Sequence, residues 1–259
     1  MKRSKQAGFT CLGKKEMKKL FVLFSVIALI YVSSNESHSA QYWAKIYEGS
    51  AAERASSIRQ TADGGYVLVG YVNDTYPYYY DIWVLKLDAE GEFSWGKTYG
   101  GDDRDAASSI QQTIDGGYIV AGYTESFGSG SRDIWILKLD QNGNATWQKT
   151  YGGIDGESAS SIKQTIDGGF IVAGNTGADS GGALILKLDS NGNISWQKTY
   201  GGSGGASVSS ISETSDGGYI AAGRIFILGS EGVLILKLDV NGDVSWHKTY
   251  SDLSFASYR

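Results

Sequence analysis

Residues 95–151 read WGKTYGGDDRDAASSIQQTIDGGYIVAGYTESFGSGSRDIWILKLDQNGNATWQKTY, and they contain every segment type on which the fold prediction rests. Within it, short segments rich in Ile, Val, Tyr, Trp and Thr alternate with turn-forming Asp, Asn and Gly. β-branched and aromatic residues favour strands, and Gly supplies the positive φ that tight hairpins need. Residues 109–123 therefore predict one hairpin and residues 133–147 a second. Two hairpins together predict one four-stranded antiparallel sheet.

The same pattern recurs along the chain with a period of about fifty residues. Tryptophans mark it at spacings of 52, 52, 49 and 50 residues, and they are Trp43, Trp95, Trp147, Trp196 and Trp246. We divide the chain into repeats at about 43–94, 95–146, 147–195 and 196–245, with a partial fifth at 246–259. A repeat of this length with several short apolar segments points to a propeller or solenoid, in which each unit buries its faces against its neighbours.

The predicted fold class is all-β, a β-propeller-like array of four repeats of four antiparallel strands. Residues 134–137 are apolar at every position, as in a strand that lies between two other sheets. Four complete sets of inner strands accompany five Trp segments, so one strand is left over. A closed four-bladed ring and an open or incomplete array are both compatible with this count. An open array would expose an edge strand that can pair with another chain.

The repeated motifs also support a family resemblance. The chain resembles, over about residues 43–250, exported bacterial and archaeal tandem-repeat proteins with WxKTYGG, SIxQTxDGGYIVAG and LKLDxNGN signatures, which are generally taken to be β-propellers. The resemblance implies the fold and no particular activity. The segment LKLDSNGNISW, which ends at Trp196, is also distantly similar to the pyrroloquinoline-quinone-type propellers, although its turn is one residue shorter. That similarity implies that the repeat tryptophans dock between blades.

The first forty residues have the pattern of a signal peptide. They carry seven Lys or Arg residues, then an apolar run from Leu20 to Val32 that only Ser25 interrupts, then small polar residues up to Ala40. This run is too short to cross a bilayer comfortably, so we expect cleavage after Ala40, a propeller domain at 41–259 and no transmembrane anchor. Cleavage after Ser34 is a second, less clean possibility. Met17 is a possible true start, and an uncleaved anchor is the alternative. The expected location is outside the cytoplasm: secreted, periplasmic or at the cell surface.

Composition excludes several classes of function. The net charge is -5, and because residues 1–40 hold seven of the 23 basic and two of the 28 acidic residues, residues 41–259 carry about -10. Nucleic-acid binding depends on clustered Lys and Arg, which this acidic domain lacks. A single cysteine and two histidines leave little for a Cys- or His-based metal site or for a catalytic triad. We expect no enzyme activity and no cofactor.

Two groups of loop residues are candidate binding sites. The strand order places the DGG and DxNG turns on one face and the variable loops on the other, where repeat proteins usually bind partners. The loop at 73–80 is the most distinctive, because it holds the only proline and four tyrosines that could stack on a sugar or anchor a protein: Tyr76, Tyr78, Tyr79 and Tyr80. Alternatively, these tyrosines simply cover the first blade.

The second group is acidic. Carboxylates gather in two successive variable loops, and oxygen ligands of this kind suit calcium: Asp102, Asp103, Asp105, Asp155 and Glu157. No fixed ligand spacing accompanies them, so solvated acidic loops are the simpler interpretation.

The sequence therefore predicts a noncatalytic exported binding module that uses the variable-loop face. An extracellular or envelope protein is one class of partner, and a glycan, bound in a lectin-like manner, is the alternative. A quinoprotein-like or carbohydrate-active enzyme is a third hypothesis, although no catalytic pair stands out. Self-association through an open edge strand is a further expectation.

Overall fold

The computed structural model describes residues 52–75, 79–177, 181–201, 205–227 and 230–251. These residues belong to one compact unit, Ser50–Arg259. The predicted signal peptide, Trp43, Tyr76 and Tyr78 lie outside the described residues.

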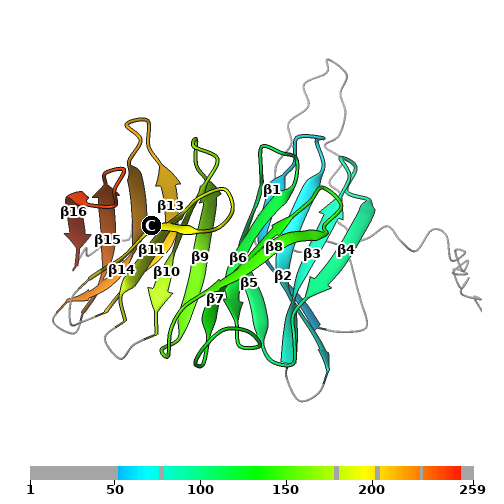
Figure 1. The fold of residues 1–259 in the computed structure, drawn as a ribbon, viewed down its shortest axis with the longest axis horizontal. Helices are drawn as coiled ribbons and strands as arrows, with labels where there is room; N and C mark the ends of the chain where they lie inside the picture. Colours follow the sequence, from blue (N-terminus) through cyan, green and yellow to red (C-terminus); the bar gives the residue numbers. More distant parts are fainter. Residues whose placement is uncertain (1–51, 76–78, 178–180, 202–204, 228–229, 252–259) are drawn as a thin grey trace, which may run out of the picture. The chain divides into compact units, whose positions relative to one another are not determined.

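Sixteen described strands form four antiparallel sheets, each a simple meander in chain order (Figure 1). Sheet 1 contains β1 (Ala52–Gln60), β2 (Tyr66–Thr75), β3 (Tyr79–Leu87) and β4 (Phe93–Tyr99). Sheet 2 contains β5 (Asp105–Gln112), β6 (Tyr118–Thr124), β7 (Asp133–Leu139) and β8 (Ala145–Tyr151).

Sheet 3 contains β9 (Glu157–Gln164), β10 (Phe170–Thr176), β11 (Ala183–Leu188) and β12 (Ile194–Tyr200). Sheet 4 contains β13 (Ala206–Glu213), β14 (Tyr219–Ile227), β15 (Ser230–Leu238) and β16 (Val244–Tyr250). The all-β, propeller-like array of four four-stranded repeats is confirmed. Within the described part of the chain, no helix is long and apolar enough to cross a bilayer.

Each sheet ends with the Trp strand that follows its three inner strands. Trp95, for example, lies in β4 and pairs with Lys86 of β3, although the sequence repeat that it opens continues into sheet 2. Among the Trp strands, β4, β8, β12 and β16 are therefore the outer strands of the four sheets. The fifth Trp segment, around Trp43, lies outside the described residues.

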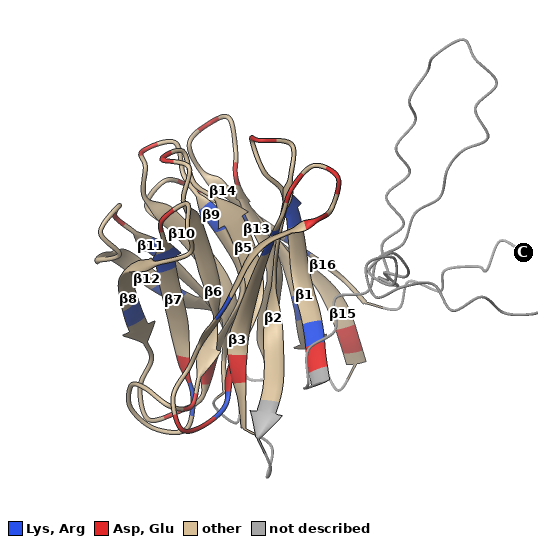
Figure 2. Cartoon of the chain, turned by 90° about the vertical axis from the view of Figure 1, so that its right-hand side faces the viewer, with Lys and Arg blue, Asp and Glu red and all other residues tan. Residues whose placement is uncertain are grey.

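The meander sorts the loops into two sets. Turns of the DGG and DxNG type join first to second and third to fourth strands, at what we call the constant-turn end. Connections from second to third strands, and from one sheet to the next, lie at the opposite, variable-loop end. Figure 2 shows that Asp and Glu are concentrated in loops at the strand ends, with few along the strand bodies.

The core consists of three apolar layers between consecutive sheets. In sheets 1 to 3, one face packs on the next sheet in the chain, and we call it the far face. The opposite face of each sheet is its near face. Ile134 and Ile136 of β7, for example, lie on the far face and pack against sheet 3, whereas Leu137 lies on the near face and packs against sheet 1. Every residue of β7 is buried, as its apolar sequence predicts. Among the described residues, no such layer joins sheet 4 to sheet 1.

The repeated glycine of the second strand is required by a close backbone approach. The first strand is irregular opposite this glycine, between Ala107 and Ser109 in sheet 2. This places the Ala106 carbonyl oxygen 1.9 Å from where a Cβ on Gly122 would lie. The same approach recurs at Gly70, Gly174 and Gly223, so the irregular pairing explains why the AG dipeptide or its equivalent carries glycine in each repeat.

Replacing Gly122 by Ala should therefore destabilise the protein, because the methyl group would overlap a backbone oxygen that cannot move without breaking the strand pairing. We expect a loss of about 2 kcal/mol or more in the free energy of unfolding, measured by urea titration. Gly153→Ala is the matched control, because a Cβ there meets no atom within 4 Å. Equal stability of the two variants would contradict this account of the repeated glycine.

Candidate functional site

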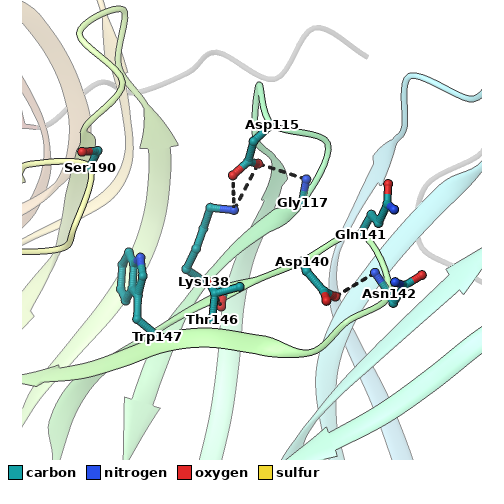
Figure 3. Close-up of a pocket in the computed structure, with 9 residues that line it drawn as sticks. All are labelled: Asp115, Gly117, Lys138, Asp140, Gln141, Asn142, Thr146, Trp147 and Ser190. Atoms are coloured by element: carbon teal, nitrogen blue, oxygen red, sulfur yellow. Dashed lines mark hydrogen bonds and ion pairs between the residues drawn. The ribbon is translucent and has the colours of Figure 1, made fainter.

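The constant-turn end is built around a repeated polar clamp. In sheet 2, the Gly117 amide donates a hydrogen bond of 3.0 Å to Asp115 Oδ1, and Lys138 Nζ lies 2.8 Å from Asp115 Oδ2 (Figure 3). Thr113 Oγ1 also donates a hydrogen bond of 2.5 Å to Asp115 Oδ1. Lys138 also donates to the Leu139 carbonyl oxygen. The equivalent ion pairs are Lys86–Asp63, Lys187–Asp167 and Lys237–Asp216. In the sequence, a lysine recurs at one position of the third strand in all four repeats, and this repetition predicts a structural role such as pairing with an acid across the hairpin. The four ion pairs confirm that prediction.

This clamp stabilises the charged form of the aspartate. Burial pushes the pKa of Asp115 upward, but hydrogen bonds from Lys138, Thr113 and Gly117 outweigh it and bring the pKa from 3.8 to about 2. Lys138 is nearly buried, whereas the Asp115 side chain is 59% exposed, so the aspartate is the solvated partner of a lysine that lies under the turn. The charge pair thus holds the turn in place.

A shallow pocket of about 520 Å³ lies beside this clamp (Figure 3). Its lining includes Asp115, Lys138, Asp140 and Trp147, with Ser190 from the turn of the next sheet. Asp140 Oδ1 accepts hydrogen bonds of 2.8 Å each from the backbone amides of Asn142 and Asn144, so its carboxylate is hydrogen-bonded within its own turn. The polar groups here serve the framework, and nothing about them distinguishes this junction as a binding site.

The outer strand of each of sheets 1 to 3 docks on the DxNG turn of the next sheet. Tyr151 donates a hydrogen bond of 2.6 Å to the Gly192 carbonyl oxygen, and Lys149 donates one of 2.7 Å to Asn193 Oδ1. The Trp147 and Phe170 rings pack together with their centroids 6.0 Å apart. A Cβ on Gly192 would lie 3.0 Å from the Trp147 ring. Trp95 and Trp196 pack in the same way on sheets 2 and 4. The described repeat tryptophans up to Trp196 are thus structural.

At the variable-loop end, side chains from sheets 1 and 2 form one connected group, which we call the tyrosine cluster: Tyr71, Tyr80, Tyr123, Glu125 and Arg132. The Tyr71 and Tyr80 rings lie 4.7 Å apart between centroids, and the Tyr80 and Tyr123 hydroxyls share a hydrogen bond of 2.6 Å. Arg132 lies 4.0 Å above the Tyr123 ring and pairs with Glu125 at 2.8 Å. Burial and the bond with Tyr80 raise the pKa of Tyr123 above its ordinary value.

The structure places only part of the predicted tyrosine site. Tyr80 joins the cluster, and Tyr79 is 43% exposed in the same strand. Tyr71, Tyr123 and Arg132 were missed by the sequence analysis. The available signal was the last position of the AGY segment, where the first two repeats have Tyr71 and Tyr123 and the later ones have other residue types.

The predicted acidic group divides into exposed and buried residues. Asp102, Asp103 and Asp155 are exposed, whereas Asp105 and Glu157 are buried. Asp105 Oδ2 accepts hydrogen bonds from the Gly101 amide at 2.9 Å and from Ser126 Oγ at 2.7 Å. Within the described part of the chain, its Oδ1 has no hydrogen-bond partner.

Glu157 plays a corresponding part at the next junction. Its Oε2 accepts the Gly153 amide at 3.0 Å. Burial and the nearby carboxylates of Asp133 and Asp155 raise its pKa, although the bond from Gly153 opposes the shift. Asp105 and Glu157 thus hold the loops that follow the KTY segments. Among the described residues, no group of three or more Asp, Glu, His or Cys side chains could hold a metal ion, so calcium binding stays a prediction.

Comparison with known proteins gives no functional assignment. The chain matches no protein-family model and no curated protein. Among solved structures, it is similar to the BBS1N chain of a BBS1N–ARL6DN complex, with 14% identity and a TM-score of 0.36, over 79% of this chain and 67% of that one. A eukaryotic initiation factor is also similar, with 9% identity and a TM-score of 0.32, over 76% of this chain and 55% of that one.

The lowered pKa of Asp115 predicts an acid-dependent stability. The ion pair with Lys138 contributes fully above the ordinary pKa of 3.8, and its contribution disappears as the pH falls through about 2. Asp115→Asn should cost about 1 kcal/mol at pH 7, a small effect because the aspartate is mostly solvated. The cost should shrink toward zero at pH 2, as measured by urea titration at each pH. Asp103→Asn, in an exposed loop, is the control, and a cost for Asp115→Asn that does not change with pH would refute the clamp.

Proposed function

We propose that this protein is a noncatalytic binding module that contacts its partner through the variable-loop end, centred on the tyrosine cluster. The observation that carries the proposal is the cluster itself. It joins aromatic and charged side chains from two sheets, and its residues are not repeated in sheets 3 and 4. A framework residue would recur with the period of the repeat, as the clamp and docking residues do.

The opposite end supports this choice. At the constant-turn end, the repeated Asp, Lys, Thr, Trp and Tyr side chains already contact one another or the next sheet. At the variable-loop end, rigid strands hold loops of different sequence, the arrangement in which binding residues are usually found. Half-buried tyrosine rings supply contact area at a low cost in side-chain entropy, and Arg132 supplies a positive charge beside them.

A protein partner of the cell envelope or the extracellular space is the first candidate. The alternative is a glycan, and the exposed aromatic rings at this end favour it: Tyr79 is 43% exposed and Phe127, in the loop of sheet 2, is 40% exposed. Such rings can stack on the apolar faces of sugars. Both candidates use the same surface, so one set of variants tests the surface and the choice of matrix separates the two.

The test is retention of the purified full chain on immobilised polysaccharides and on envelope proteins. We expect saturable retention on one of them, and Tyr80→Ala should weaken it at least about tenfold because that change removes contact area and the bond to Tyr123. Phe93→Ala is the matched control, since Phe93 is 63% exposed beside a constant turn. Circular dichroism should show that both variants are folded. Equal binding by the two variants, or a lack of retention on either matrix, would count against the proposal.

We also propose that the protein is exported by its N-terminal segment. Expression of the full chain in a bacterial host should yield protein outside the cytoplasm whose first residue, determined by mass spectrometry, is Gln41. Replacing Ile27 and Leu29 in the apolar run by Asp should retain the uncleaved chain in the cytoplasm. A chain that stays intact and cytoplasmic without these replacements would contradict export.

A further inference from the structure

The far face of sheet 4 matches surfaces that the other three sheets bury. Val233 pairs with Tyr250 across β15 and β16 as Ile82, Ile134 and Ala183 pair with the tyrosines of their own outer strands. Those three equivalents are fully buried under the next sheet, whereas Val233 is 44% exposed. Ile220 and Ile235 on the same face are only partly buried, and their counterparts in sheets 1 to 3 are completely buried. The far face of sheet 4 thus has the apolar composition of an interior face but is partly exposed to solvent.

The outer strand of sheet 4 repeats this contrast. Trp246, Lys248 and Tyr250 are exposed, and they correspond to the Trp, Lys and Tyr that dock each earlier outer strand on the following sheet. Here Lys248 lies over its own Trp246 ring, 5.6 Å from the centroid. An apolar face and a complete set of docking side chains therefore lie together on one surface.

We propose that the far face of sheet 4 is a dimer interface that packs against the same face of a second copy of this chain. This inference concerns a surface separate from the tyrosine cluster, so it stands or falls independently of the proposed function. Face packing is a different route to self-association from the edge-strand pairing that the sequence predicts. Two sheets that meet by a two-fold axis would bury the β15 and β16 side chains as sheet-on-sheet packing buries them within the chain.

Two observations select this arrangement. Head-to-tail docking would need the near face of sheet 1 in the other copy, but Leu68, Leu85 and Leu87 on that face are at most 5% exposed. The sheet 4 face is also self-complementary in charge, because Arg224 and Glu231 lie 3.7 Å apart on it and are both largely exposed. A two-fold axis can bring the positive side chain of one copy to the negative side chain of the other.

The test is sedimentation velocity of the purified full chain over a range of concentrations, with two variants. Val233→Lys places a charge on the far face of sheet 4, and it should raise the dimer dissociation constant at least about tenfold because burying an unpaired ammonium is costly. Ile114→Lys is the matched control, since Ile114 is 95% exposed at a constant turn. Unchanged thermal unfolding of both variants at low concentration would show that the substitutions leave the fold intact.

The expected result is a dimer for the unmodified chain and for Ile114→Lys, and a monomer for Val233→Lys. A chain that stays monomeric at about 100 μM would overturn the proposal. Association that persists in Val233→Lys would also overturn it. Such association would have to arise from a part that all three proteins share, such as the N-terminal segment or the β16 edge. Assemblies that grow beyond a dimer would indicate a head-to-tail contact and would equally exclude the two-fold interface.

Discussion

The packing of each sheet's far face on the near face of the next is the interaction on which the whole array depends. The third strands carry apolar side chains in both directions, so an isolated sheet would leave two apolar faces in water. Burying one Ile or Leu side chain contributes about 1.5–3 kcal/mol, and each layer contains several of them. A single repeat therefore gains its stability only when a neighbour covers it, which is why the repeats occur in tandem.

Polar contacts then set the geometry of this packing. The Asp–Lys clamp fixes the turn between the first two strands. Tyr–Gly bonds, and lysine bonds to Asn or Asp, join the outer strands of sheets 1 to 3 to the next sheet. These contacts recur with the repeat because they belong to the framework. They occupy the constant-turn end, and sequence variation is therefore concentrated in the loops at the other end. This division explains why the tyrosine cluster and the buried carboxylates of Asp105 and Glu157 both lie among the variable loops.

The far face of the last sheet differs from the other three because no further sheet packs on it among the described residues. Sheets 1 to 3 each cover their far face with a neighbour, whereas sheet 4 presents the same residue types partly exposed to solvent. Apolar surfaces of this kind usually mark a contact with another molecule. The protein thus has two distinct surfaces available for contact. One consists of variable loops at a sheet junction, and the other is a sheet face with an interior composition.

The sequence alone determined the strands, the hairpins and the four-sheet array, because strand periodicity and turn chemistry are local properties that the repeat shows four times. It also predicted the pairing of the repeated lysine with an acid, since a contact across one hairpin is still local. Only the tertiary structure brought Tyr71, Tyr80, Tyr123 and Arg132 together, because they come from two sheets that meet through packing. It also decided which carboxylates point inward and which sheet face remains exposed, because burial depends on neighbours that are distant in the sequence.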